Sequence, residues 1–182
     1  MPVLTKGSFS LNLGIVQLGG ELSEFDRQCA WELYTELTTR VALTGKQRDQ
    51  RCDDFSGEIL VESLSSVHSF FREARGIMRT FPVGKLRADS GHHLGILVND
   101  LLRDALRPFL EKWQAKLRHW WEHESNPKLH PFARQREFPE LSALRKDWID
   151  LRRLMRGVQK TLVKTYALVE VTRKPPRGRR KR

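Results

Sequence analysis

The sequence predicts an all-α fold, an antiparallel four-helix bundle with a short N-terminal β-strand and a disordered basic C-terminal tail. Two segments repeat apolar residues at alternating steps of three and four, the 3.5-residue period of helices that pack along a shared seam. Four apolar-periodic segments of twenty or more residues are separated by loops rich in glycine or proline. We expect residues 1–171 to form one helical domain and residues 172–182 to form the tail.

The N-terminal strand is expected at residues 8–18. Apolar residues there alternate with small or polar ones, which is the period of a half-buried strand. A lone strand leaves its backbone donors and acceptors unpaired, so it needs a partner. The β-branched segment ALVEV at 167–171 is one candidate, and a second protein chain is the other.

The first helix is expected at about residues 23–43, because apolar residues recur every four positions after a potential N-cap at Ser23 and Thr44-Gly45 ends the pattern. These residues are Phe25, Cys29, Leu33, Leu37 and Val41.

The second helix is expected at about residues 57–81, and its apolar positions have the clearest period in the chain. They are Leu60, Leu64, Val67, Phe71, Ala74, Met78 and Phe81, with Pro82 ending the helix. An acidic cluster precedes it and would favour the positive end of the helix dipole. The cluster consists of Asp49, Asp53, Asp54 and Glu58.

The third helix is expected at about residues 92–123. Its core positions are Leu94, Val98, Leu101, Ala105, Phe109, Trp113, Leu117 and Trp120. Pro108 lies inside this segment, where it removes an amide donor, so a kink or a break is expected there. A linker with three prolines follows.

The fourth helix is expected at about residues 139–166. Its apolar seam is Leu141, Leu144, Trp148, Leu151, Met155, Val158 and Leu162. Its remaining positions are strongly basic and carry Arg145, Arg152, Arg153, Arg156, Lys160 and Lys164.

Two segments resemble an uncharacterised bacterial family of helical proteins. FDRQCAWELYTELTTRVAL in the first helix matches a W-E-L-Y-x-E-L-x-T-R pattern, and LRPFLEKW in the third matches L-R-P-F-L-x-K-W. The resemblance implies a helical fold and a prokaryotic origin. It carries no activity and no site residue, and it suggests a bacterial defence system as a setting.

Positive charge is concentrated in the last third of the chain. Residues 1–127 hold 16 Lys and Arg against 17 Asp and Glu, whereas residues 128–182 hold 17 against 5. Seven of the cations lie in the tail, which has nothing apolar to bury. They are Arg173, Lys174, Arg177, Arg179, Arg180, Lys181 and Arg182. Together with the basic face of the fourth helix, they predict contact with the phosphates of RNA or DNA.

The segment RHWWEH, residues 118–123, matches two catalytic patterns. Read as H-x-x-E-H it is an inverted zinc-protease signature, but His119 and His123 would face away from the core without a second shell. Read as R-x4-H, with Arg118 and His123, it is similar to the motif of HEPN-type ribonucleases, which would need a dimer to complete the site. Otherwise the cations complement the helix C-terminus, and Trp120 and Trp121 cap the bundle or bind a protein partner.

No other motif indicates catalysis, a cofactor or a metal. The sequence holds no phosphate-binding loop and no hydrolase elbow. His92-His93 has no ligand partner at a suitable spacing. Cys29 and Cys52 are expected to be reduced thiols, and no segment suits a bilayer or a signal peptide, so we expect a cytoplasmic protein without a membrane contact.

The leading hypothesis is therefore a non-enzymatic accessory protein that binds nucleic acid within a larger complex. The first alternative is a protein–protein adaptor, which would use the N-terminal strand or the end of the bundle with Trp120 and Trp121. The second alternative is a HEPN-like ribonuclease. A protein partner or self-association is expected in each case.

Overall fold

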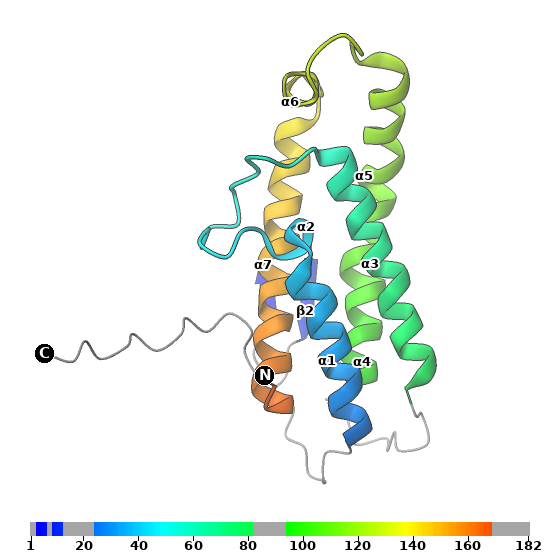
Figure 1. Ribbon diagram of the computed structural model, residues 1–182, viewed down its shortest axis with the longest axis vertical. Coiled ribbons are helices and arrows are strands. Elements are labelled where there is room, and N and C mark those ends of the chain that lie inside the picture. The colour runs from blue at the N-terminus through cyan, green and yellow to red at the C-terminus, as the bar shows by residue number, and fades with distance from the viewer. Residues whose placement is uncertain (1–2, 7–8, 13–23, 82–93, 169–182) are drawn as a thin grey trace, which may run out of the picture.

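The computed structural model describes residues 3–6, 9–12, 24–81 and 94–168, and most of them are helical (Figure 1). The expected all-α class is confirmed for this part of the chain. The tail at 172–182 and the loop at 82–93, which includes His92-His93, lie outside the described residues.

The helices and helical turns follow one another along the chain. They are α1 (Glu24–Thr39), α2 (Val41–Thr44), α3 (Leu60–Thr80), α4 (Leu94–Asp100), the π-helical turn η2 (Leu101–Leu106), α5 (Arg107–His119), the π-helical turn η3 (Trp120–Glu124), α6 (Pro131–Arg134), the 3-10 turn η4 (Gln135–Glu137) and α7 (Leu141–Tyr166). The proline-rich linker after η3 thus contains one short helix and one 3-10 turn.

The long helices lie side by side and alternate in direction along the chain (Figure 1). α1 packs against α7 and α3, and α5 packs against α3 and α7. These contacts place α3 and α7 at opposite corners of the assembly.

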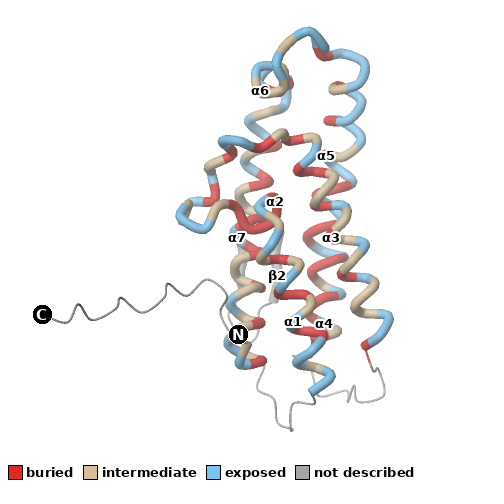
Figure 2. The backbone as a smooth tube through the Cα atoms, viewed as in Figure 1, coloured by how far each residue is buried: buried red, intermediate tan, exposed pale blue. Residues whose placement is uncertain are grey.

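The core lies along the seams of the long helices (Figure 2). Every core position expected between Leu94 and Trp120 is buried, as are the seam positions of α7 from Leu144 to Leu162. α3 differs at two expected positions, because Phe71 and Met78 are only partly buried, whereas Phe70 is fully buried. In α1, Cys29, Leu33 and Leu37 are buried, but Phe25 is exposed.

The first helix is shorter than expected. Arg40 has extended backbone angles (φ −108°, ψ 101°) and separates α1 from the single turn of α2. Gly45, at φ +66°, then ends α2 in a conformation that favours glycine. The chain turns here into the long loop of residues 45–59.

Pro108 does not break its helix, because residues 94–124 are helical throughout. The turn before it, η2, is π-helical, and the amide of Arg107 donates to the carbonyl of Leu102, five residues back. A wider turn makes room for the proline ring and for the missing amide. Of the expected kink or break, the break is therefore absent.

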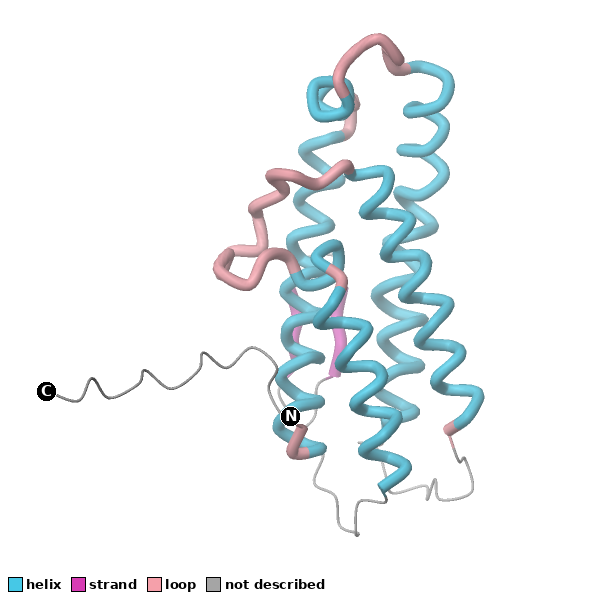
Figure 3. The backbone as a smooth tube through the Cα atoms, in the orientation of Figure 1, coloured by secondary structure: helices cyan, strands magenta, loops and turns pink. Residues whose placement is uncertain are grey.

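A short antiparallel hairpin precedes α1 (Figure 3). β1 (Val3–Lys6) pairs with β2 (Phe9–Asn12), and Thr5 lies opposite Ser10. β2 packs on η2 and α7. Residues 13–18 of the expected strand, and most of the segment 167–171, lie outside the described residues.

The N-terminus of α3 is capped by a residue far along the chain. The acidic cluster does not cap it, since the N-cap position is Ile59 and makes no side-chain cap. Instead the buried amide of Gln135 accepts a hydrogen bond from the Leu60 amide at 2.9 Å and donates to the Glu58 carbonyl at 3.0 Å. This contact ties the linker before α7 to the start of α3.

Candidate nucleic-acid interface

The cations of α7 divide into two rows on different sides of the helix. At about 100° per residue, Arg145, Arg152 and Arg156 share one side, and Lys146, Arg153, Lys160 and Lys164 share another about 100° away. We call the first set the inner arginine row and the second set the outer basic row. The two rows have different environments.

The inner arginine row holds the loop of residues 45–59. The guanidinium of Arg152 is completely buried and contacts both carboxylate oxygens of Glu58. It also lies over the ring of Phe55, 4.1 Å from the centroid. Arg145 lies on the same ring at 5.5 Å. The expectation that Arg152 contacts nucleic acid was wrong, because its whole side chain is enclosed by the fold.

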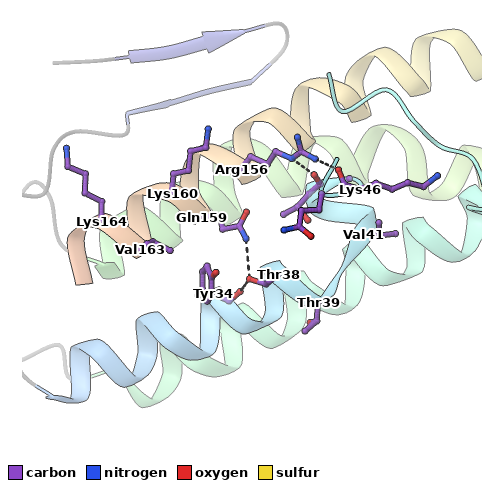
Figure 4. Close-up of a pocket in the computed structure, with 13 residues that line it drawn as sticks. Tyr34, Thr38, Thr39, Val41, Lys46, Arg156, Gln159, Lys160, Val163 and Lys164 are labelled. Carbon is purple, nitrogen blue, oxygen red and sulfur yellow. Dashed lines mark hydrogen bonds between the residues drawn. The ribbon is translucent and has the colours of Figure 1, made fainter. Parts of the chain in front are cut away.

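Arg156 binds the loop through its backbone. Its three guanidinium nitrogens donate to the carbonyls of Thr44, Lys46 and Asp49 at 2.5 to 2.6 Å. Figure 4 shows Arg156 reaching toward the segment that holds Lys46. A fork of five fixed donors suits such a convergent set of carbonyls. Arg156 therefore anchors the loop. These three hydrogen bonds do not support its expected role as a phosphate contact.

Carboxylates inside the loop complete its structure. Asp49 accepts hydrogen bonds from the amides of Arg51, Cys52 and Asp54. The backbone amide of Asp54, together with those of Arg51 and Cys52, holds the pKa of Asp49 below its usual range, although burial acts in the opposite direction. The pKa of Asp54 is strongly lowered by Ser56 and by Lys46, which is 2.9 Å away.

The outer basic row points away from the core. It lies about 180° around α7 from the buried seam of Trp148, Met155 and Leu162. Lys146, Arg153, Lys160 and Lys164 are all exposed, over a helix length of about 27 Å. Arg153 makes the one ion pair found for this row among the described residues, to Asp150 at 3.5 Å. The row thus presents nearly uncompensated charge.

A groove beside the outer basic row adds polar groups to it (Figure 4). The groove has a volume of about 650 Å³ and lies between α1, the start of the loop and α7. Lys160 and Lys164 stand on one side of it, and Gln159 donates to the hydroxyl of Thr38 across it at 3.3 Å. Lys46 and Arg156 also line it, and none of the described lining residues is acidic. The groove is therefore suited to an anion.

The two candidate catalytic residues are both exposed. Arg118 is exposed and lines a groove between α5 and α3. The ring of His123 lies 5.0 Å from that of His119, and both are exposed. A ribonuclease site would still need a second copy of the chain. Among the described residues, no three His, Cys, Asp or Glu side chains cluster as a metal site.

The tryptophan pair is not an open docking surface. Trp120 is buried against Phe138, with ring centroids 5.2 Å apart, so its expected role in binding a partner was wrong. Trp121 is partly buried beneath the guanidinium of Arg134, 4.1 Å from the ring centroid. Arg134 also donates to the Trp121 carbonyl and to the Ser125 hydroxyl. The pair closes the end of the helical assembly.

The sequence did not predict two cations at the outer basic row and the groove beside it, Lys146 and Lys46. Lys146 begins the i, i+7, i+14 pattern that Arg153 and Lys160 continue, and this spacing alone could have placed it in the outer basic row. No comparable signal exists for Lys46, because the loop brings it to α7 across more than a hundred residues. The seven cations of the tail lie outside the described residues.

Comparison with protein-family models, with curated proteins and with solved structures gave no match. Among the described residues, none of the helices combines the length and the apolar character needed to cross a bilayer.

Proposed function

We propose that this protein is a non-enzymatic accessory protein that binds RNA or DNA within a larger complex, with a bacterial defence system as the setting. Its helices would form an antiparallel four-helix bundle, and the phosphate contacts would be made by the outer basic row and the basic tail. The observation that carries this proposal is the outer basic row itself, in which four exposed cations share one side of α7 and one has a carboxylate partner.

Nucleic acid is the ligand that best fits this charge. A duplex carries one negative charge per about 1.7 Å of its axis, so a row about 27 Å long faces many phosphates at once. Binding through such contacts releases counterions and does not read base sequence. The groove next to Lys160 and Lys164 would hold one further phosphate or sugar, through Gln159 and the threonines of α1.

The experiment is an anisotropy titration of a labelled duplex and a labelled single strand at several salt concentrations. Lys160→Glu/Lys164→Glu should weaken binding at least about tenfold and lower the slope of log K against log salt by about 2. Deletion of residues 172–182 should weaken binding further. The matched control is Lys128→Glu/Arg136→Glu, which makes the same charge change at two exposed positions outside the outer basic row. Equal affinity of all variants, or no binding at low salt, would refute the proposal.

The adaptor remains a second candidate because of the hairpin. β2 pairs with β1, and in the described part of the chain this sheet has two strands, each with one outer edge. Such an edge can accept a strand from another protein. A partner that co-purifies with the protein, and is lost when residues 1–12 are removed while nucleic-acid affinity is retained, would support this function.

A further inference from the structure

A second basic surface lies between α3 and α5. The groove there has a volume of about 810 Å³ and is lined by His68, Phe71 and Arg75 of α3 and by Arg107, Leu110 and Arg118 of α5, among others. None of these residues belongs to the outer basic row or to the groove beside it. The groove between α3 and α5 is therefore a separate basic feature.

α3 carries a row of basic side chains, of which His68 and Arg75 line this groove. His68, Arg72, Arg75 and Arg79 are spaced by four, three and four residues, so they share one side of α3 within about 60°. All four are exposed. The described residues include one carboxylate paired with this row, that of Glu73 with Arg72 at 3.2 Å. Arg75 lies over the ring of Phe71 at 5.8 Å.

The α5 side adds two more guanidinium groups. Arg107 pairs with Glu111 at 2.7 Å, whereas no ion pair is found for Arg118 within the described part of the chain. Arg75 and Arg118 thus line the groove from two helices, and neither forms an ion pair in the described part of the chain. The groove also holds one carboxylate, that of Glu111. Guanidinium groups bind phosphate through two parallel hydrogen bonds, which makes them well suited to a nucleic-acid backbone.

The two basic surfaces lie on different sides of the molecule. α3 contacts α1 and α5, α7 contacts the same two helices, and α3 and α7 occupy opposite corners (Figure 1). The outer basic row points directly away from the core on α7. A duplex bound there would leave the groove between α3 and α5 uncovered.

We infer that the α3/α5 groove is a second phosphate-binding surface, so that one copy of the protein holds two nucleic-acid segments at once. This inference rests on the proposed function and extends it from binding to bridging. A protein ligand fits the groove less well, because the exposed large apolar residues of the described chain are Phe25, Trp31, Val41 and Ile96, and none of them lines it. Protein interfaces are usually centred on such side chains.

Bridging can be measured with two short duplexes, one fixed to beads through biotin and the other fluorescent. Wild-type protein is titrated in, and the fluorescence retained on the beads is recorded. The test variant is Arg75→Glu/Arg118→Glu, and the matched control is Lys128→Glu/Arg136→Glu, with the same charge change outside both surfaces. Thermal unfolding of each variant establishes that it is folded. Sedimentation of the free proteins shows whether they are monomers.

The test variant should lose bridging at least about fivefold while its affinity for a single duplex stays within about a factor of two, since one of two sites remains. The control should bridge like the wild type. Bridging by the test variant at the wild-type level would overturn the inference and leave the proposed function intact. A wild-type dimer that the test variant converts to a monomer would overturn it too, because the groove would then join two copies of the chain.

The failure of the proposed function has a different signature. In that case Lys160→Glu/Lys164→Glu would bind a single duplex as tightly as the wild type, or the wild type would bind no duplex at all. Loss of all binding in Arg75→Glu/Arg118→Glu alone would assign the whole interaction to the α3/α5 groove and overturn the two-surface arrangement.

Discussion

The guanidinium of Arg152 lies 2.7 and 2.6 Å from the two carboxylate oxygens of Glu58, and the side chains of both residues are buried. Glu58 precedes α3 and Arg152 lies in the middle of α7, so this pair joins two segments 94 residues apart in the chain. The Nε of Arg152 also donates to the carbonyl of Ala42 in α2 at 3.3 Å. One side chain thereby links α7, α2 and the loop that leads into α3.

Removing one partner of this pair should be costly. Arg152→Ala would leave the Glu58 carboxylate buried with the Ser63 hydroxyl at 3.1 Å as its remaining side-chain donor. Breaking a buried pair in this way typically costs about 3–5 kcal/mol, because the remaining charge loses its compensation. Urea unfolding followed by circular dichroism should show a loss of that size in the free energy of unfolding.

The double variant Arg152→Met/Glu58→Gln tests the same argument from the other side. It removes both charges, so it should be more stable than Arg152→Ala even though it carries more changes. Arg153→Ala, the exposed neighbour, should change the free energy of unfolding by less than about 1 kcal/mol. If Arg152→Ala were as stable as Arg153→Ala, the pair would have no structural role.

Arg156 should control the reactivity of Cys52. Cys52 is buried in the loop that Arg156 holds, and burial raises the pKa of its thiol, so little reactive thiolate is present at neutral pH. Arg156→Ala removes three hydrogen bonds to the loop and should let it open more often. Alkylation of Cys52 should become at least about tenfold faster, which corresponds to about 1.4 kcal/mol of easier opening.

The internal control for this experiment is Cys29, which is buried in α1, and burial also raises the pKa of its thiol. Its alkylation rate should not change in Arg156→Ala, because Cys29 lies in the first half of α1, next to Thr80 of α3, and not at the end of α1 that borders the loop. Mass spectrometry of the two labelled peptides separates the rates. Equal acceleration of both cysteines would mean that the variant weakens the whole fold and would contradict a local role.

Asp49 should make the loop sensitive to acid. Its pKa is lowered, chiefly by the amide of Asp54, so the folded protein binds a proton at this site less readily than the unfolded chain does. The stability that it contributes is therefore complete above the ordinary aspartate value of 3.8 and is lost as the pH falls below it. Asp49→Asn should be less stable than the wild type at pH 7, and the difference should shrink in acid.

Chemical unfolding at pH 7, 5 and 3 measures this difference. Asp53→Asn serves as the matched control, because Asp53 is the exposed neighbour in the same loop. It should follow the wild-type stability closely at all three values. A gap between Asp49→Asn and the wild type that stays constant from pH 7 to pH 3 would rule out the titration of Asp49 as its cause.

The apolar periods of the sequence were sufficient to predict the long helices. α7 was expected at 139–166 and runs from Leu141 to Tyr166, and its seam from Leu144 to Leu162 is buried. The period of seven residues fixes which side of a helix is buried, because an error of one residue would turn the seam by about 100°. In α3 the core residue after Val67 was expected to be Phe71 but is Phe70. Steps of three and of four residues both occur in this repeat, so the period alone did not distinguish the two.

The roles of the cations could not be predicted from their number. Arg152 and Arg153 are adjacent and chemically identical, yet one is buried against Glu58 and the other is exposed. The difference depends on where the loop of residues 45–59 crosses α7, and that crossing is set by contacts between residues about a hundred positions apart. Charge counts along the chain predict a basic surface but do not separate structural arginines from free ones.

Arg145 and Lys146 offer the sharpest test of that separation, because they are adjacent and belong to different rows. Lys146→Ala should reduce the slope of log K against log salt by about 1 for nucleic-acid binding, since it removes one exposed cation from the outer basic row. Arg145→Ala should leave the slope unchanged and lower the stability instead, because its guanidinium packs on Phe55. Anisotropy titrations at four salt concentrations, together with urea unfolding of both variants, measure the two effects. Equal slopes for the two variants would show that position around α7 does not decide which cations meet phosphate.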